Sequence, residues 1–147
     1  MLGRKDYTKG EYEHGKAAVD QQVAAYKKSV TAVSGKGSDQ KMDAALEEFD
    51  VHFVNNMVLA LDRGFVHRLR VATGKDCNPL NEVEMLCDSL INNNGVFRGN
   101  NVIQWIPDQT VLNLKPGDPI RLTEGDFEHL SGAFFTELKV KFLRTRA

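Results

Sequence analysis

Residues 59–95, LALDRGFVHRLRVATGKDCNPLNEVEMLCDSLINNNG, contain the end of one helix, a loop and the whole of the next helix. An apolar helical pattern enters this stretch and turns polar at Asp62. Gly74 suits the end of a helix, because glycine adopts the left-handed conformation found there at little cost. Asn78 and Pro79 are typical of the N-cap and the first position of a new helix. The stretch therefore predicts two helices joined by a short loop.

The first of these helices is predicted to begin at Ser38 or Asp39 and to continue to Thr73. A straight helix of about 35 residues would span roughly 50 Å, which matches or exceeds the diameter of a compact domain of this size. We therefore expect either a kink at Arg63 and Gly64 or an extension into a partner subunit.

The apolar positions of this helix cover about half of its circumference between residues 42 and 69, which is wider than one neighbouring helix needs. This width predicts a homodimer. Its contact is expected to include Val54, Val58, Leu61 or Phe65.

Three further regions carry regular patterns. Apolar steps of three and four predict a helix over about 12–33, and the same spacing from Leu80 to Ile91 predicts the helix after Asn78. β-Branched and aromatic residues over 101–106 and 111–114, followed by the turn at 115–118, predict short strands. Thr123 and Asp126 form a capping-box pattern before an apolar stripe that ends at Phe142. The predicted fold class is mainly α, a single-domain bundle of four helices with a small β-hairpin between the third and fourth.

The composition is that of an ordinary globular protein. The chain has 147 residues, 41% hydrophobic and 27% charged, which suits one domain over 1–147 in which we expect residues 1–10 to be flexible. The net charge of -1 gives no electrostatic reason to expect nucleic acid or a membrane surface as a partner. No apolar run approaches the roughly 20 residues of a membrane span, and no secretory signal is present. We therefore expect a cytoplasmic protein with Cys77 and Cys87 reduced.

The strongest candidate site is the group of ionisable residues around the loop. A helix N-terminus presents unpaired N–H groups and a partial positive charge, so cations beside it can complete a site for a small anionic ligand. Basic residues are also common at a helix C-terminus, where they only offset its dipole. The candidate ligand-binding residues are Asp62, Arg63, His67, Arg68, Arg70, Lys75 and Asn78.

Two charged residues, Asp50 and Arg68, project onto the apolar face of the long helix. Burying an unpaired charge costs several kcal/mol, so each is expected to have a partner on another helix or another subunit. They lie too far apart along one helix to pair with each other. Structural ion pairs are therefore favoured over a catalytic role.

A metal site is a weaker alternative. Glu48 lies one helical turn before His52, so its carboxylate can reach the imidazole. His129 follows Asp126 at a spacing that resembles the motif of helical metal proteins. Di-iron bundles need Glu-x-x-His on two helices. This chain has Glu11-x-x-His14 near its expected flexible start, and Asp126-x-x-His129, where an aspartate stands in place of the glutamate. No metal or other cofactor is predicted, with Glu48, His52 and His129 as the alternative ligands.

Several runs of the sequence, FVHRLR at 65–70, GKDCNPLNEV at 74–83 and LKPGDPIRL at 114–122, together with later residues up to Leu138, cover about half of the chain. They resemble a group of short bacterial proteins with no established activity. The resemblance implies a cytosolic bacterial protein and no mechanism.

Three function hypotheses follow from the sequence. The leading one is a non-enzymatic helical protein that acts through a homodimer or an assembly with a partner protein. The second is a small-ligand or anion-binding protein, or an enzyme, with its site near the loop after the long helix. The third is a metal-binding helical bundle. No nucleophile elbow, phosphate loop or dinucleotide motif is present, so the sequence indicates no class of enzyme.

Overall fold

The computed structural model describes residues 3–4, 6–34 and 40–143, and over these residues the protein is mainly helical, as predicted. None of the helices within these ranges has the length and apolar character needed to cross a membrane. The elements in chain order are α1 (Lys9–Ser34), α2 (Gln40–Arg63), α3 (Arg70–Thr73), α4 (Pro79–Asn92), the 3-10 turn η1 (Pro107–Gln109) and α5 (Glu124–Phe142).

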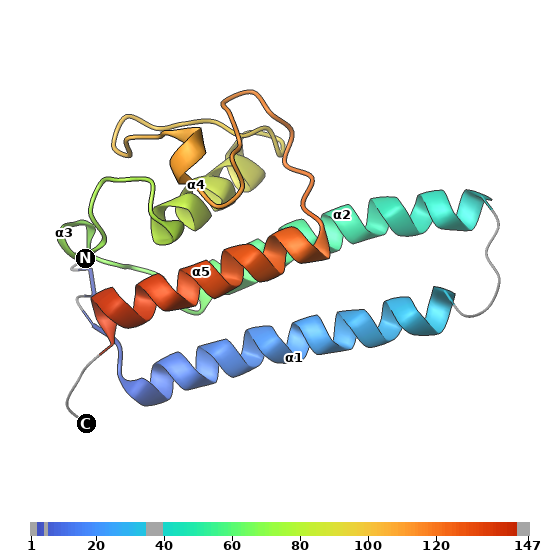
Figure 1. Cartoon of the computed structure of the whole chain (residues 1–147), viewed down its shortest axis with the longest axis horizontal. Helices are drawn as coiled ribbons and strands as arrows, with labels where there is room; N and C mark the ends of the chain where they lie inside the picture. The colour runs from blue at the N-terminus through green and yellow to red at the C-terminus, as the bar shows by residue number, and fades with distance from the viewer. Residues whose placement is uncertain (1–2, 5, 35–39, 144–147) are drawn as a thin grey trace.

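Helix α2 lies at the centre and packs against α1, α4 and α5. Figure 1 shows α1 and α2 running antiparallel, with their ends near residues 34 and 40 projecting beyond the rest of the molecule. Helix α4 and the long segment 93–123 cover the side of α2 and α5 opposite α1 (Figure 1). The start of α1 and the end of α5 lie at the end of the molecule away from the projecting helix ends (Figure 1).

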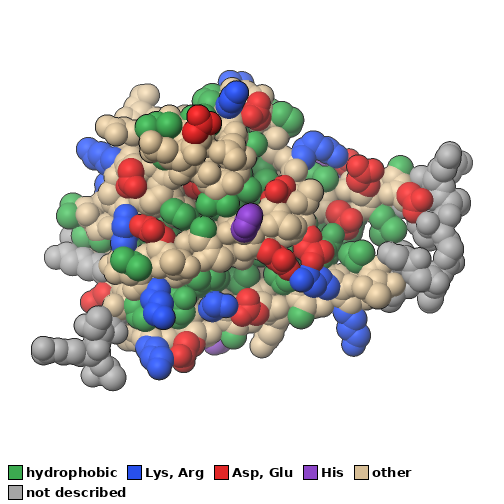
Figure 2. Space-filling model, in the orientation of Figure 1, with side chains coloured by type: hydrophobic (Ala, Val, Ile, Leu, Met, Phe, Trp, Pro, Cys, Tyr) green, Lys and Arg blue, Asp and Glu red, His purple; other side chains and the backbone are tan. Residues whose placement is uncertain are grey.

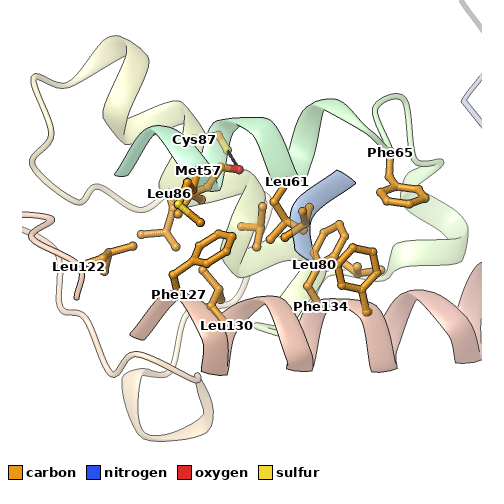
Figure 3. Close-up of a cluster of buried hydrophobic side chains, with 14 of the residues drawn as sticks. Met57, Leu61, Phe65, Leu80, Leu86, Cys87, Leu122, Phe127, Leu130 and Phe134 are labelled. Carbon is orange, nitrogen blue, oxygen red and sulfur yellow. Dashed lines mark hydrogen bonds between the residues drawn. The ribbon is translucent and has the colours of Figure 1, made fainter. Parts of the chain in front are cut away.

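The core forms where α2, α4 and α5 meet, and Figure 3 shows aromatic and aliphatic side chains from these helices filling it. This packing contradicts the predicted dimer contact, because the four side chains expected there are all 0–1% exposed within one chain. The wide apolar face of α2 is covered by three helices of the same chain rather than by a partner subunit. The four residues are Val54, Val58, Leu61 and Phe65.

The long helix does not continue to Thr73, and α2 ends at Arg63. The expected break at Arg63 and Gly64 is present as a turn, in which the Phe65 N–H donates to the Asp62 carbonyl over 3.0 Å. His67 then adopts a φ of 64°, which few residues other than glycine adopt. Residues 64–69 therefore turn the chain away from α2 instead of extending it.

Arg4 and Tyr7, which lie in the stretch 1–10 for which we expect flexibility, make backbone hydrogen bonds to distant parts of the chain. The Arg4 carbonyl accepts a hydrogen bond from the Leu69 N–H over 2.9 Å, and the Tyr7 N–H donates to the Phe142 carbonyl over 2.7 Å. The Tyr7 side chain is 2% exposed and packs edge-on against the Phe65 ring. The described residues at the N-terminus thus connect the end of α2 to the end of α5.

The two helix starts predicted from local signals are present. Asn78 caps α4 by accepting from the N–H groups of its first turn, and Pro79 occupies the first helical position. Thr123 and Asp126 form the complete capping box of α5. Both signals act over three residues or fewer, so they do not depend on the surrounding fold.

The predicted β-hairpin is not formed, since the described segment 93–123 contains no strand and its only β-bridge is an isolated one between Val96 and Pro119. Other backbone hydrogen bonds, such as that from the Gln104 N–H to the Lys75 carbonyl over 2.8 Å, and several side chains hold the segment in place. The Trp105 Nε1–H donates to the Leu114 carbonyl over 2.8 Å, and its ring lies 4.7 Å from that of Phe97. β-Branched and aromatic residues here fill the space over α4 rather than form a ladder.

Candidate functional site

Arg68 and Asp62, two of the predicted site residues, form a largely buried ion pair. The Arg68 guanidinium donates to Asp62 Oδ1 over 2.8 Å and to the Phe65 carbonyl over 2.7 Å, and only 6% of its side chain is exposed. It also lies 5.4 Å from the centre of the Phe134 ring. The partner expected for Arg68 therefore comes from the same chain, at the turn that ends α2.

Arg70 lies at the start of α3 and bonds to α4. Its guanidinium donates to Asn81 Oδ1 over 2.7 Å, to Glu84 Oε2 over 2.6 Å and to the Gly74 carbonyl over 3.1 Å. The Asn81 side chain is fully buried and donates in turn to the Asp76 carbonyl over 2.7 Å. The positive charge of Arg70 thus serves to hold the loop against α4.

The N–H groups at the start of α4 are occupied by Asn78. Its Oδ1 accepts from the Leu80 N–H over 3.0 Å and from the Asn81 N–H over 3.1 Å. Its Nδ2 donates to the Thr73 carbonyl over 2.8 Å, and Lys141 Nζ donates to the same carbonyl over 3.0 Å. The donors that an anion site at this helix start requires are therefore bonded to the protein itself.

The remaining candidate residues are separated from this network. The His67 and Lys75 side chains are exposed and form no ion pair among the described residues. Arg63 lies on the other side of the turn, where it lines a hollow between α1 and α2. The structure thus brings Asp62 together with Arg68, and Arg70 together with the region of Asn78. His67, Lys75 and Arg63 form no hydrogen bond or ion pair of their side chains with these groups among the described residues.

The alternative metal ligands do not form a site. Glu48 pairs with His52 over 3.2 Å, as the spacing predicted, and with Arg121 over 3.5 Å. His129 lies on the exposed surface of α5. Across residues 3–4, 6–34 and 40–143, no three His, Cys, Asp or Glu side chains are grouped as metal ligands.

Asp50, the second charge on the apolar face of α2, is partnered by α1. A side-chain hydrogen bond to Asp50, together with burial as the larger cause, raises the pKa of Tyr26 to about 12. The other oxygen, Oδ1, is buried without a hydrogen-bond partner among the described residues. The Tyr26 ring stacks on Phe53 at 5.1 Å, so this contact joins α1 to α2.

Two buried polar residues with structural roles were missed by the sequence analysis. Glu82, 1% exposed, accepts from the N–H groups of Val111 and Leu112 over 2.8 and 2.9 Å. Burial raises the pKa of the Glu82 carboxyl, and these two N–H groups oppose that rise. Asn55 donates to the Ile120 carbonyl over 2.9 Å. Glu82 has the sequence position of an ordinary acid in the first turn of a helix, so no local signal separates it from an exposed one.

Both cysteines are free and buried. The Cys87 Sγ lies 3.6 Å from the Val58 carbonyl in the core (Figure 3), as expected for a small apolar residue. Burial raises the pKa of its thiol, which opposes formation of the reactive thiolate.

Two of the surface hollows among the described residues are lined by α1. The first, which we name the α1–α5 groove, has a volume of about 690 Å³. The second, which we name the N-terminal pocket, has a volume of about 460 Å³ and lies between the start of the chain, α1 and the end of α2. Residues lining the α1–α5 groove include Tyr12, Lys16, Val23, Phe135, Lys139 and Val140.

Comparison of the chain with protein-family models, with curated protein sequences and with solved structures found no match. The function is therefore inferred from the surfaces and side chains of this structure alone.

Proposed function

We propose that this protein is a non-enzymatic assembly protein of the bacterial cytosol, and that it pairs with a second copy of itself through the α1–α5 groove. The observation that carries the proposal is the apolar surface left open there. Val140 is 78% exposed, and Tyr12 and Val23 on the facing helix are only half-buried. Figure 2 shows hydrophobic side chains along the seam between α5 and α1, with charged side chains on both sides.

The charges beside the groove suit a two-fold arrangement. The α1 wall carries Lys16 and Asp20, which pair with each other over 3.2 Å. The α5 wall carries Lys139 and also Glu128, which pairs with Lys27 of α1. Exposed ion pairs of this kind contribute at most about 1 kcal/mol, so a copy related by a two-fold axis can exchange them for pairs between the acidic groups of one copy and the basic groups of the other. Self-association through one shared patch is the commonest form of homo-oligomer.

The ionisable groups of the loop favour this proposal over catalysis there. Arg68 and Arg70 are bonded to Asp62 and Glu84, and the start of α4 is capped by Asn78. A charge that is already paired has to break that pairing before it can bind a substrate. These residues stabilise the fold around the end of α2. A functional site is therefore expected on an open surface such as the α1–α5 groove rather than at this loop.

Sedimentation velocity over a concentration series tests the proposal. We expect a reversible dimer at micromolar concentrations, and Val140→Asp should weaken it at least tenfold, because the new carboxylate is desolvated at the contact. Val71→Asp is the matched control, since Val71 is 90% exposed on α3, away from the groove. A wild-type monomer throughout the series, or equal effects of the two substitutions, contradicts the proposal.

A further inference from the structure

The N-terminal pocket has an apolar floor made by small side chains. Ala18 of α1 and Ala60 of α2 face this hollow, with Val19 and Leu61 beside them. At Gly15 the Phe65 ring packs directly on the α1 backbone, and a Cβ atom there would overlap the ring. Helix α1 is thus in close contact with the turn after α2 at one end of the pocket, while the alanines leave the pocket open next to that contact.

The rim of the pocket is polar and carries an unmatched positive charge. Arg4 and Glu11 pair over 2.9 Å and offset each other. Arg63, the last residue of α2, has no ion pair or hydrogen bond from its side chain among the described residues. The same holds for His14 and Gln22, which lie on the same rim. The pocket therefore offers one free guanidinium, an imidazole and an amide above an apolar floor.

We propose that the N-terminal pocket binds a small amphipathic carboxylate, with its apolar part over Ala18 and Ala60 and its carboxylate at Arg63. A volume of about 460 Å³ lies within the range of small-molecule sites, which combine an apolar lining with a few polar groups. A guanidinium binds a carboxylate through two parallel hydrogen bonds, and one uncompensated positive charge matches one negative charge. His14 and Gln22 supply further donors to the same group.

This site differs from the one expected from the sequence and retains one of its residues. The anion hypothesis placed the ligand at the start of α4, where Asn78 caps the N–H groups. Arg63 is the candidate cation that points away from that network and into a hollow. The proposal is independent of the dimer, because none of the residues lining the N-terminal pocket lines the α1–α5 groove.

Isothermal titration of the full chain with octanoate tests the site. We expect saturable binding of one octanoate per chain, and much weaker binding of acetate, which lacks the apolar part, and of 1-octanol, which lacks the charge. Arg63→Gln should weaken octanoate binding about tenfold through loss of a charge-assisted hydrogen bond. Arg98→Gln is the matched control, since Arg98 is also exposed but lies outside the pocket.

A second pair of variants tests the floor. Ala18→Leu fills the pocket and should abolish binding, whereas Ala17→Leu, one residue away on an exposed position of α1, should leave it unchanged. Circular dichroism confirms that each variant folds. Three results overturn the proposal: no saturable octanoate binding by the wild type, equal weakening by Arg63→Gln and Arg98→Gln, or 1-octanol binding as tightly as octanoate.

Discussion

Replacing Arg68 with alanine tests whether the polar cluster at the end of α2 is structural. The guanidinium makes two short hydrogen bonds, to Asp62 over 2.8 Å and to the Phe65 carbonyl over 2.7 Å. A hydrogen bond to a charged group contributes about 1.5–3 kcal/mol, and loss of one partner leaves the other buried group unpaired. Asp62 keeps 26% of its side chain exposed, so its carboxylate regains some hydration in the variant. We therefore assign each of the two hydrogen bonds the lower end of the range, about 1.5 kcal/mol.

We therefore expect Arg68→Ala to lower the free energy of unfolding by about 3 kcal/mol. At about 2–4 °C per kcal/mol for a chain of this size, Tm should fall by roughly 6–12 °C. Urea unfolding followed by far-ultraviolet circular dichroism measures the free energy, with Arg98→Ala as a control that should stay within about 0.5 kcal/mol of the wild type.

A double-mutant cycle of Arg68→Ala with Asp62→Asn isolates the ion pair. We expect a coupling energy of about 1 kcal/mol or more, because the two side chains bond directly in a largely buried site. A loss below about 1 kcal/mol for Arg68→Ala, or a loss equal to that of Arg98→Ala, refutes the structural role assigned to this pair.

Three other predictions follow. Asn55→Ala should cost about 2–3 kcal/mol in urea unfolding, because it leaves two buried backbone groups unpaired, whereas its exposed neighbour Asn56→Ala should cost far less. Tyr26 should titrate near pH 12 by ultraviolet absorbance. Because its pKa in the folded chain lies above the usual tyrosine pKa of 10.0, stability should fall as pH rises from 10.0 towards 12, and titration near 10.0 refutes this. Cys77 and Cys87 should react with a thiol reagent only on unfolding, and fast labelling of the native chain contradicts their burial.

The sequence predicts those parts of the fold that depend on interactions between residues close together along the chain. The start of α4 at Asn78 and the capping box of α5 at Thr123 were both predicted, because each depends on hydrogen bonds between residues two or three positions apart. The apolar spacing of α2 likewise predicted which face is buried. That spacing contains no information about the identity of the neighbour, so a partner subunit was expected where α1, α4 and α5 pack.

The candidate site could be predicted only as a list of residues. Arg68 was expected to need a partner, but its pairing with Asp62 depends on the turn at 64–69, where α2 ends earlier than predicted. The sequence does not show whether neighbouring charges bond to each other or remain free for a ligand. Tertiary structure separates Arg63, which faces the N-terminal pocket, from Arg68 and Arg70, which are paired.

The sequence by itself determined the helical class, the face that α2 buries and the starts of α4 and α5. Only the tertiary structure decided how segment 93–123 is held, since Glu82 and Asn55 bond to backbone groups about 30 and 65 positions away. It also decided which surfaces stay open, because a hollow depends on where separate helices come together. Local hydrogen bonding and periodicity act over a few residues, whereas burial and pairing of charges depend on contacts between distant parts of the chain.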